Sequence, residues 1–163
     1  MREWPSIPHE SFPVHRIRRV AHPINFSAAS RNALSWAIQL AEQYHAGLLL
    51  LHVIPPPTPI FELESPVKFQ AELALSVLLA KLQSAGIESR GFLLTGKTSI
   101  DDQIVRAARL ECIDLIVMGT RGRTAISRLL AGSVTSRVIT HAPCPVLVIP
   151  DRGTAATHSP LEK

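Results

Sequence analysis

The sequence predicts an α/β fold in which a doubly wound, five-stranded parallel sheet carries helices on both faces. Short apolar runs alternate along the chain with segments whose apolar residues recur at helical spacing. Three of the runs are almost uninterrupted, which is typical of parallel strands buried on both sides. The chain has 163 residues and a hydrophobic fraction of 46%, enough for one domain with a substantial core.

The first strand is expected over residues 17–24, and Pro23 near its end indicates that its hydrogen bonding finishes there. Ser27 suits the N-cap of the helix that follows, and Gly47 is expected to end that helix. The apolar positions of the helix share one face: Leu34, Ala37, Ile38 and Ala41.

A second strand is expected over residues 48–54, where the proline-rich block 55–59 ends it. Pro66 suits the first turn of a second helix that runs to Gly86. The spacing predicts that this helix buries Phe69, Leu73, Val77, Leu78 and Leu82. Residues 87–95 mix polar and apolar side chains, as an edge strand does.

Ser99, followed by Asp102 three residues later, indicates the start of a third helix, and the fourth strand is expected over residues 115–118. A last helix is predicted from Ser133 to His141, before a closing strand at Val146–Ile149. The buried stripe of the third helix comprises Ile100, Ile104, Ala107, Ala108 and Glu111. Residues 1–15 are expected to form an irregular arm, residues 16–150 the domain, and residues 151–163 a polar tail.

The composition excludes several classes of protein. Lys and Arg number 17 against 13 Asp and Glu, but the charges are scattered, so nucleic acid is not an expected partner. Cys112 and Cys144 lie far apart, without the spacing of a zinc site or a disulfide framework. The longest apolar runs are too short to cross a bilayer, and the N-terminus lacks the order of a signal peptide. We therefore expect a cytoplasmic protein without a membrane partner.

The stretch from Asp114 to Ser133 has the residues of a phosphate-binding loop. An apolar strand leads into Gly119 and Gly122, and Gly132–Ser133 comes before the last predicted helix. Glycines let backbone amides approach an anion, and a helix N-terminus adds unpaired amides and a positive dipole end. The same residues also fit purely structural turns, with Ser133 capping a helix, so the motif alone leaves two interpretations.

These glycines and the serine form the pattern G-x2-G-x9-G-S, with Arg123 beside the second glycine. In this pattern the chain resembles the universal stress protein family, of the type that binds adenine nucleotides. The resemblance extends over residues 16–150. Three further segments carry it: 23–27 at the first-strand turn, 51–53 at the end of the second strand, and 143–148 at the closing strand.

The resemblance implies the strand order 3-2-1-4-5, a homodimer formed through the Val146–Ile149 strand, and ATP or a related adenine nucleotide as ligand. It assigns Gly119, Gly122, Gly132 and Ser133 to ribose and phosphates, and a backbone amide contact to Val134. Val53 would pack against adenine, with Pro23 and Met118 nearby. Arg123 would contact phosphate, because a guanidinium can pair with a phosphate through two hydrogen bonds.

One position departs from the family pattern. The turn after the first strand usually carries Asp, and here it carries Asn25, which lacks the charge that would hold Mg²⁺. Two interpretations of Asn25 stay open, a ligand contact and a turn residue that bonds its own backbone. His22 and His52 lie near predicted strand ends, without a carboxylate or nucleophile at a recognisable catalytic spacing.

The expected function is binding of an adenine nucleotide, with conformation or assembly responding to the ligand in a stress response. No carboxylate beside the loop is suited to activate water, so we expect slow or absent hydrolysis. The alternatives are a dimeric interaction module without nucleotide and a slow ATPase.

Overall fold

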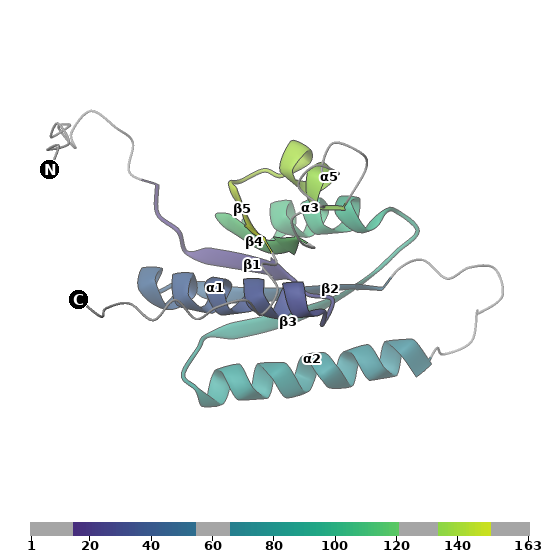
Figure 1. Cartoon of the computed structure of the whole chain (residues 1–163), viewed down its shortest axis with the longest axis horizontal. Coiled ribbons are helices and arrows are strands. Elements are labelled where there is room, and N and C mark those ends of the chain that lie inside the picture. Colours follow the sequence, from purple (N-terminus) through teal and green to yellow (C-terminus); the bar gives the residue numbers. More distant parts are fainter. Residues whose placement is uncertain (1–14, 55–65, 121–133, 151–163) are drawn as a thin grey trace, which may run out of the picture.

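The computed structural model describes residues 15–54, 66–120 and 134–150, drawn in colour in Figure 1. Gly122, Arg123, Gly132 and Ser133 lie outside the described residues, as do nearly all of the expected arm and the whole expected tail. Within the described ranges, no helix is long and apolar enough to cross a membrane.

A single parallel sheet forms the centre of the fold, with strand order β3-β2-β1-β4-β5. The predicted strand order is therefore confirmed. The chain enters at β1 in the middle, adds β2 and β3 on one side, then crosses over to add β4 and β5 on the other. The strands are β1 (Arg19–Pro23), β2 (Gly47–Ile54), β3 (Ser89–Thr95), β4 (Leu115–Thr120) and β5 (Val146–Pro150).

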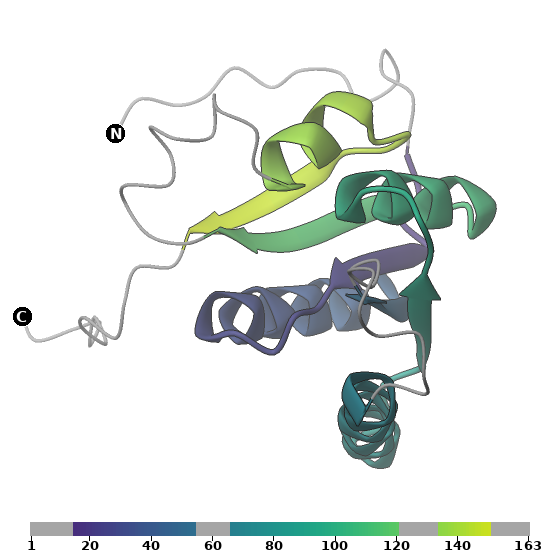
Figure 2. The same cartoon turned by 90° about the vertical axis from the view of Figure 1, so that its right-hand side faces the viewer.

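Helices cover both faces of this sheet, as predicted (Figures 1 and 2). Side chains of β1 and β2 alternate between the two faces, so each face has its own apolar cluster. Val20, Leu48 and Leu50 face α1 and α2, whereas Ala21 and Leu49 face α3 and α5. The helices are α1 (Ala28–Tyr44), α2 (Pro66–Ser84), α3 (Ile100–Leu110) and α5 (Val134–His141).

The predicted first strand was too long at both ends. At the start of β1, the backbone amides of Arg18 and Arg19 donate to Oδ2 of Asp114, at 2.8 and 3.0 Å. After β1, the amide of Ile24 still donates to the carbonyl of Leu51, at 2.9 Å, although the strand has ended at Pro23. The Asp114 carboxylate therefore ties the entry of the first strand to the start of the fourth.

Three helices end in the same hydrogen-bonded motif, closed by a residue in the left-handed region. The residue is His45 after α1, Gly86 after α2 and Cys112 after α3, with φ of 52, 81 and 48°. In each case the backbone amide of the following residue donates to the carbonyl oxygen five residues before it, as Ala46 N does to Ala41 O at 2.8 Å. Gly47 was thus wrongly predicted to end α1, because a histidine holds the position that glycine usually occupies.

Glycine at position 45 or 112 is expected to stabilise the fold by about 0.5–1 kcal/mol, because at these two helix ends a side chain strains a left-handed backbone. His45→Gly and Cys112→Gly should each raise the urea midpoint at an unchanged m-value. Gly86→Ala is the matched control and should lower it by a similar amount. A loss of stability in both glycine variants would contradict the assignment of strain to these two positions.

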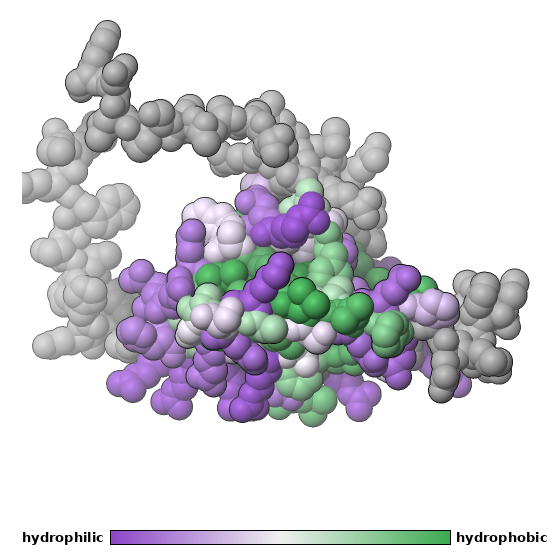
Figure 3. Space-filling model, turned by 90° about the horizontal axis from the view of Figure 1, so that it is seen from below, coloured by the Kyte–Doolittle hydropathy of each residue, from purple (hydrophilic) through white to green (hydrophobic). Residues whose placement is uncertain are grey.

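The buried face of α2 agrees with the predicted one only at Leu78 and Leu82, which pack in the core. Phe69, Leu73 and Val77 are 68, 54 and 48% exposed, and the buried residues are Ala71, Leu75 and Leu82. Figure 3, viewed from the α2 side, shows a band of hydrophobic side chains on this surface. Apolar residues surround the whole helix, so spacing alone does not select one face. Contact with the sheet decides which face is buried. Gly91 of β3 leaves room for the Leu79 side chain of α2, which would lie 2.6 Å from a Cβ added at Gly91.

Candidate functional site

The candidate site lies at the edge of the sheet where β2, β1 and β4 end side by side. Pro23 is the last residue of β1, Val53 is next to last in β2, and Gly119 is next to last in β4. The strand order reverses between β1 and β4, and open α/β sheets bind ligands outside the carboxyl ends of strands at such a point. Three predicted site residues, distant in sequence, therefore converge at this edge.

An apolar wall borders this edge on the α3 side. Met118 is 5% exposed and belongs to the apolar cluster between the sheet and the helices α3 and α5. Val53 and Val134 are half-buried and pack against the same cluster. The structure thus brings together three predicted residues from β2, β4 and the start of α5, and their surface suits a flat apolar ring.

Asn25 is a turn residue whose side chain is engaged locally. Its Oδ1 accepts hydrogen bonds from Ser27 Oγ at 2.7 Å and from Ser27 N at 3.2 Å. Ser27 Oγ in turn accepts from Ser30 N at 3.2 Å, which makes Ser27 the predicted N-cap of α1. The side-chain nitrogen of Asn25 is thereby left as the group through which this exposed residue would contact a ligand.

The turn after β1 is held in a strained conformation. Phe26 has a φ of 59°, which costs roughly 1–2 kcal/mol in a residue with a side chain. Its carbonyl accepts from Arg31 Nη1 at 2.6 Å, and the carbonyl of Ile24 accepts from His52 Nδ1 at 2.7 Å. The rings of Phe26 and His52 lie 5.2 Å apart between centroids. These contacts hold the turn through groups of the protein itself.

His22 lies directly behind this turn and is fully buried. Its Nδ1 is 2.8 Å from the carbonyl of Val117, which can only accept, so Nδ1 carries the proton. The unprotonated Nε2 therefore accepts from the hydroxyl of Ser30, at 3.2 Å. Burial lowers the pKa of His22 to about 4, against a smaller opposing effect of these hydrogen bonds. At neutral pH this histidine is an uncharged structural link and not an acid or base at the site.

Gly119 has a packing role that the sequence motif did not reveal. A Cβ at this position would lie 2.4 Å from the carbonyl oxygen of Ala29 and 3.3 Å from the amide nitrogen of Ser30. The first turn of α1 therefore rests directly on the backbone of β4. Glycine is needed here for this close approach, in addition to the ribose and phosphate role that the resemblance implies.

The described residues of this site offer Mg²⁺ no carboxylate, and Asn25 Oδ1 already has two donors. In the part of the chain that the structure describes, no group of three or more His, Cys, Asp or Glu is placed to hold a metal ion. The described residues of the site offer a ligand apolar surface and hydrogen-bonding groups.

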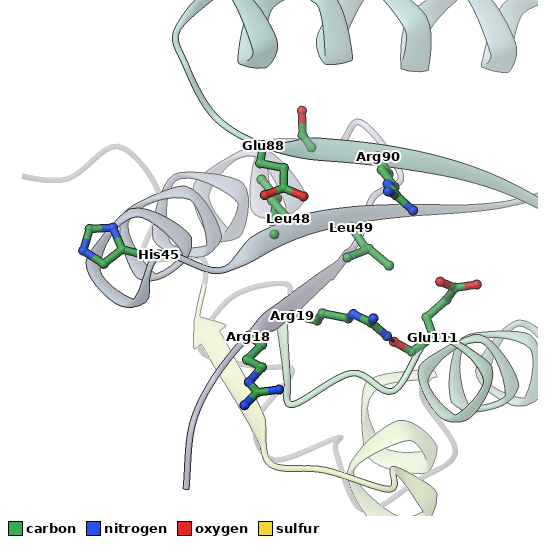
Figure 4. A pocket seen from close by; sticks show the side chains of 10 residues that line it. Arg18, Arg19, His45, Leu48, Leu49, Glu88, Arg90 and Glu111 are labelled. Atoms are coloured by element: carbon green, nitrogen blue, oxygen red, sulfur yellow. Dashed lines mark hydrogen bonds between the residues drawn. The ribbon is translucent and has the colours of Figure 1, made fainter.

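A polar hollow of about 220 Å³ lies at the opposite, amino-terminal edge of the sheet (Figure 4). It is lined by the starts of β1, β2 and β3 and by Glu111 at the end of α3. Arg19 points toward Glu111 and donates from Nη1 to its carbonyl oxygen at 2.6 Å, so it satisfies a helix terminus. This hollow is separated from the candidate site by the length of the strands.

Ser30 and Ala29 shape the site although neither was predicted from the sequence. Ser30 is 6% exposed, and its buried hydroxyl links the first helix to His22. The available signal was a polar residue three positions after the N-cap, on the helix face that carries Ala33, Leu34 and Ala37. Gly122, Arg123, Gly132 and Ser133 stay predictions, since they lie outside the described residues.

Comparison with known proteins gives a consistent result. Residues 16–150 match the model of the universal stress protein family. A universal stress protein of Methanocaldococcus jannaschii is 32% identical over 140 residues, covering 81% of each chain. The crystal structure of a family member from Burkholderia pseudomallei superposes with a TM-score of 0.68 at 27% identity, over 85% of this chain and 99% of that one.

Three further structures of universal stress proteins share the fold and contain nucleotides. One is a complex with cAMP, at a TM-score of 0.64 and 23% identity, over 83% of this chain and 98% of that one. An Archaeoglobus fulgidus protein with dAMP has a TM-score of 0.62 at 22% identity, over 82 and 97%. An Arabidopsis thaliana protein with AMP bound has a TM-score of 0.60 at 22% identity, over 88 and 97%.

Proposed function

The chain belongs to the universal stress protein family, and we propose that it binds an adenine nucleotide and changes its conformation or assembly in response. The convergence of three strand ends on an apolar wall is the observation that carries this proposal, and the glycine motif follows one of these strands in the sequence. The fold likeness to proteins solved with cAMP, dAMP and AMP supports an adenine nucleotide over other ligands.

In the proposed complex, the adenine ring packs against the half-buried Val53 at the sheet edge, with the buried Met118 nearby. Pro23 borders the ring, and Asn25 donates from its side-chain nitrogen to the ribose. Gly119, Gly122, Gly132 and Ser133 hold ribose and phosphates, with the amide of Val134 at the start of α5. Arg123 pairs with phosphate.

This arrangement supports binding better than hydrolysis. Cleavage of a phosphoanhydride needs a positioned water and compensation for the charge of the leaving phosphate. The described site residues include no carboxylate that could orient water, so we propose that turnover is slow or absent. Mg²⁺, if it enters with ATP, would be held mainly by the phosphates.

The proposed assembly is a homodimer through β5. This strand is at the edge of the sheet, and Leu147 at its centre is 36% exposed. An edge strand with an apolar outward side chain is a natural surface for pairing with a second copy. The cytoplasm is the proposed location.

Nucleotide binding is tested by melting temperature and calorimetry with AMP, ADP and ATP at millimolar concentration. A ligand at 100 times its Kd stabilises the native state by about 2.7 kcal/mol, so the melting temperature should rise by several degrees. Gly122→Val, which blocks the predicted amide approach, should lose this rise.

Absence of a shift with all three nucleotides, together with an intact dimer on size-exclusion chromatography, would favour the interaction module and contradict nucleotide binding. Phosphate release from ATP that disappears in Gly122→Val would instead identify a slow ATPase.

A further inference from the structure

The Ser30 hydroxyl connects three segments of the chain that meet at the candidate site. Ser30 Oγ accepts from the backbone amide of Asn25 at 3.3 Å and donates to Nε2 of His22 at 3.2 Å. Nδ1 of His22 donates to the carbonyl of Val117 at 2.8 Å, directly before Met118. One chain of hydrogen bonds therefore runs from the turn after β1 to the middle of β4.

The direction of each bond in this chain is fixed by chemistry. A backbone carbonyl only accepts and a backbone amide only donates, so the two ends of the chain are set by Val117 and Asn25. The imidazole and the hydroxyl between them each have one donor and one acceptor in use. Because Ser30 and His22 are 6 and 0% exposed, water cannot easily replace a missing member.

We propose that Ser30 and His22 are positioning residues, which act through the Asn25 turn and the backbone of β4 at Val117 to hold the nucleotide pocket in its binding arrangement. The proposal rests on the proposed nucleotide-binding function. Neither side chain touches the ligand; both join the ribose side of the pocket to the wall formed by Met118.

The turn needs this support because its backbone is strained at Phe26. Without the Ser30 hydroxyl, the amide of Asn25 loses its acceptor and the turn can relax into other conformations. The apparent Kd then rises in proportion to the fraction of molecules that leave the competent arrangement. Loss of one buried hydrogen bond in such a link corresponds to an affinity about tenfold weaker.

Ser30→Ala is expected to weaken AMP binding about tenfold by calorimetry, and Ser30→Thr, which keeps the hydroxyl, to restore it. Ser89→Ala is the matched control. Ser89 is also 6% exposed, lies at the start of β3, and has an Oγ without a hydrogen-bond partner among the described residues. Its removal should leave the affinity unchanged.

Hydrogen exchange separates positioning from a general loss of stability. The Asn25 amide should gain protection on AMP binding in wild type and Ser30→Thr, and gain much less in Ser30→Ala. Leu82→Ala removes a buried side chain of α2, so it should lower global stability while the AMP affinity stays at the wild-type value.

His22→Asn keeps a donor toward Val117 but removes the acceptor for Ser30, so it should also weaken AMP binding about tenfold. Because both residues act through one link, the double variant should lose no more than either single variant. His22→Asn alone also tests the proposal if Ser30→Ala does not fold.

Wild-type affinity in both Ser30→Ala and His22→Asn would overturn the positioning role while leaving nucleotide binding intact. Additive losses in the double variant would overturn the single link. No binding of AMP, ADP or ATP to the wild type would overturn the proposed function, and this role with it.

Discussion

Replacing Gly119 with alanine is expected to destabilise the fold by about 3 kcal/mol and to abolish nucleotide binding. The new Cβ would lie 2.4 Å from the carbonyl oxygen of Ala29 and 2.8 Å from its carbonyl carbon. Both are backbone atoms, which cannot rotate away as a side chain can. The first turn of α1 must therefore move off β4, and this turn carries Ser30 and the N-cap Ser27.

Two other glycines provide a graded control for Gly119→Ala, measured by urea unfolding at a common m-value. At Gly91 the nearest atoms, 2.6 and 3.0 Å away, are ends of the Leu79 and Leu75 side chains, so Gly91→Ala should cost about 1 kcal/mol. At Gly96 the nearest atom is 3.5 Å away, an ordinary contact, so Gly96→Ala should change stability by less than about 0.5 kcal/mol. Equal stability of the Gly119 and Gly96 variants would contradict the backbone contact.

The fold was predictable because the buried strands are continuous apolar runs, which can be recognised in the sequence without knowing how the elements pack. Residues 48–51 are all buried and all apolar, and such runs occur where a sheet is covered on both faces. The helix N-caps were equally predictable. Ser27 and Ser99 each accept a hydrogen bond from the backbone amide three residues later. The strand order did not follow from these patterns, and it was predicted from the resemblance to a known family.

The end of a helix was less predictable than its start. Glycine signals a left-handed residue at Gly86, but His45 and Cys112 adopt the same conformation with side chains that make it less favourable than it is for glycine. At both positions the following residue, Ala46 or Ile113, is buried against the core. Packing of that residue selects the backbone conformation before it, and a single sequence does not contain this information.

The place of the candidate site was predictable, because the carboxyl ends of parallel strands meet at one edge of the sheet, where Pro23, Val53 and Met118 lie. The ligand contacts of these residues came from the family resemblance and stay predictions. The approach of α1 to Gly119, and the link through Ser30, depend on how the helix lies across the sheet. A polar side chain buried between two elements is recognisable as a link only after both elements are placed.

Acidification is expected to cost the wild-type protein about 3 kcal/mol of stability through His22 alone. Burial without a charge partner lowers the pKa of this imidazole from 6.5 to about 4. Between these two values the unfolded chain binds a proton at His22 and the folded chain does not. The unfolded state therefore gains stability as the pH falls from 6.5, and the loss levels off below about pH 4, where the folded state is protonated as well.

The contribution of His22 is isolated by comparing wild type with His22→Asn in urea unfolding between pH 7.5 and 3.5. Carboxylates titrate in the same range in both proteins, so their effect cancels in the difference. His22→Asn should be the less stable protein at pH 7.5, because Ser30 loses its acceptor. The difference in unfolding free energy between the two proteins should narrow or reverse toward pH 4. A difference in unfolding free energy that stays constant with pH would mean that His22 has the same pKa in the folded and unfolded chains. Such a result would contradict the neutral, buried link between Ser30 and Val117.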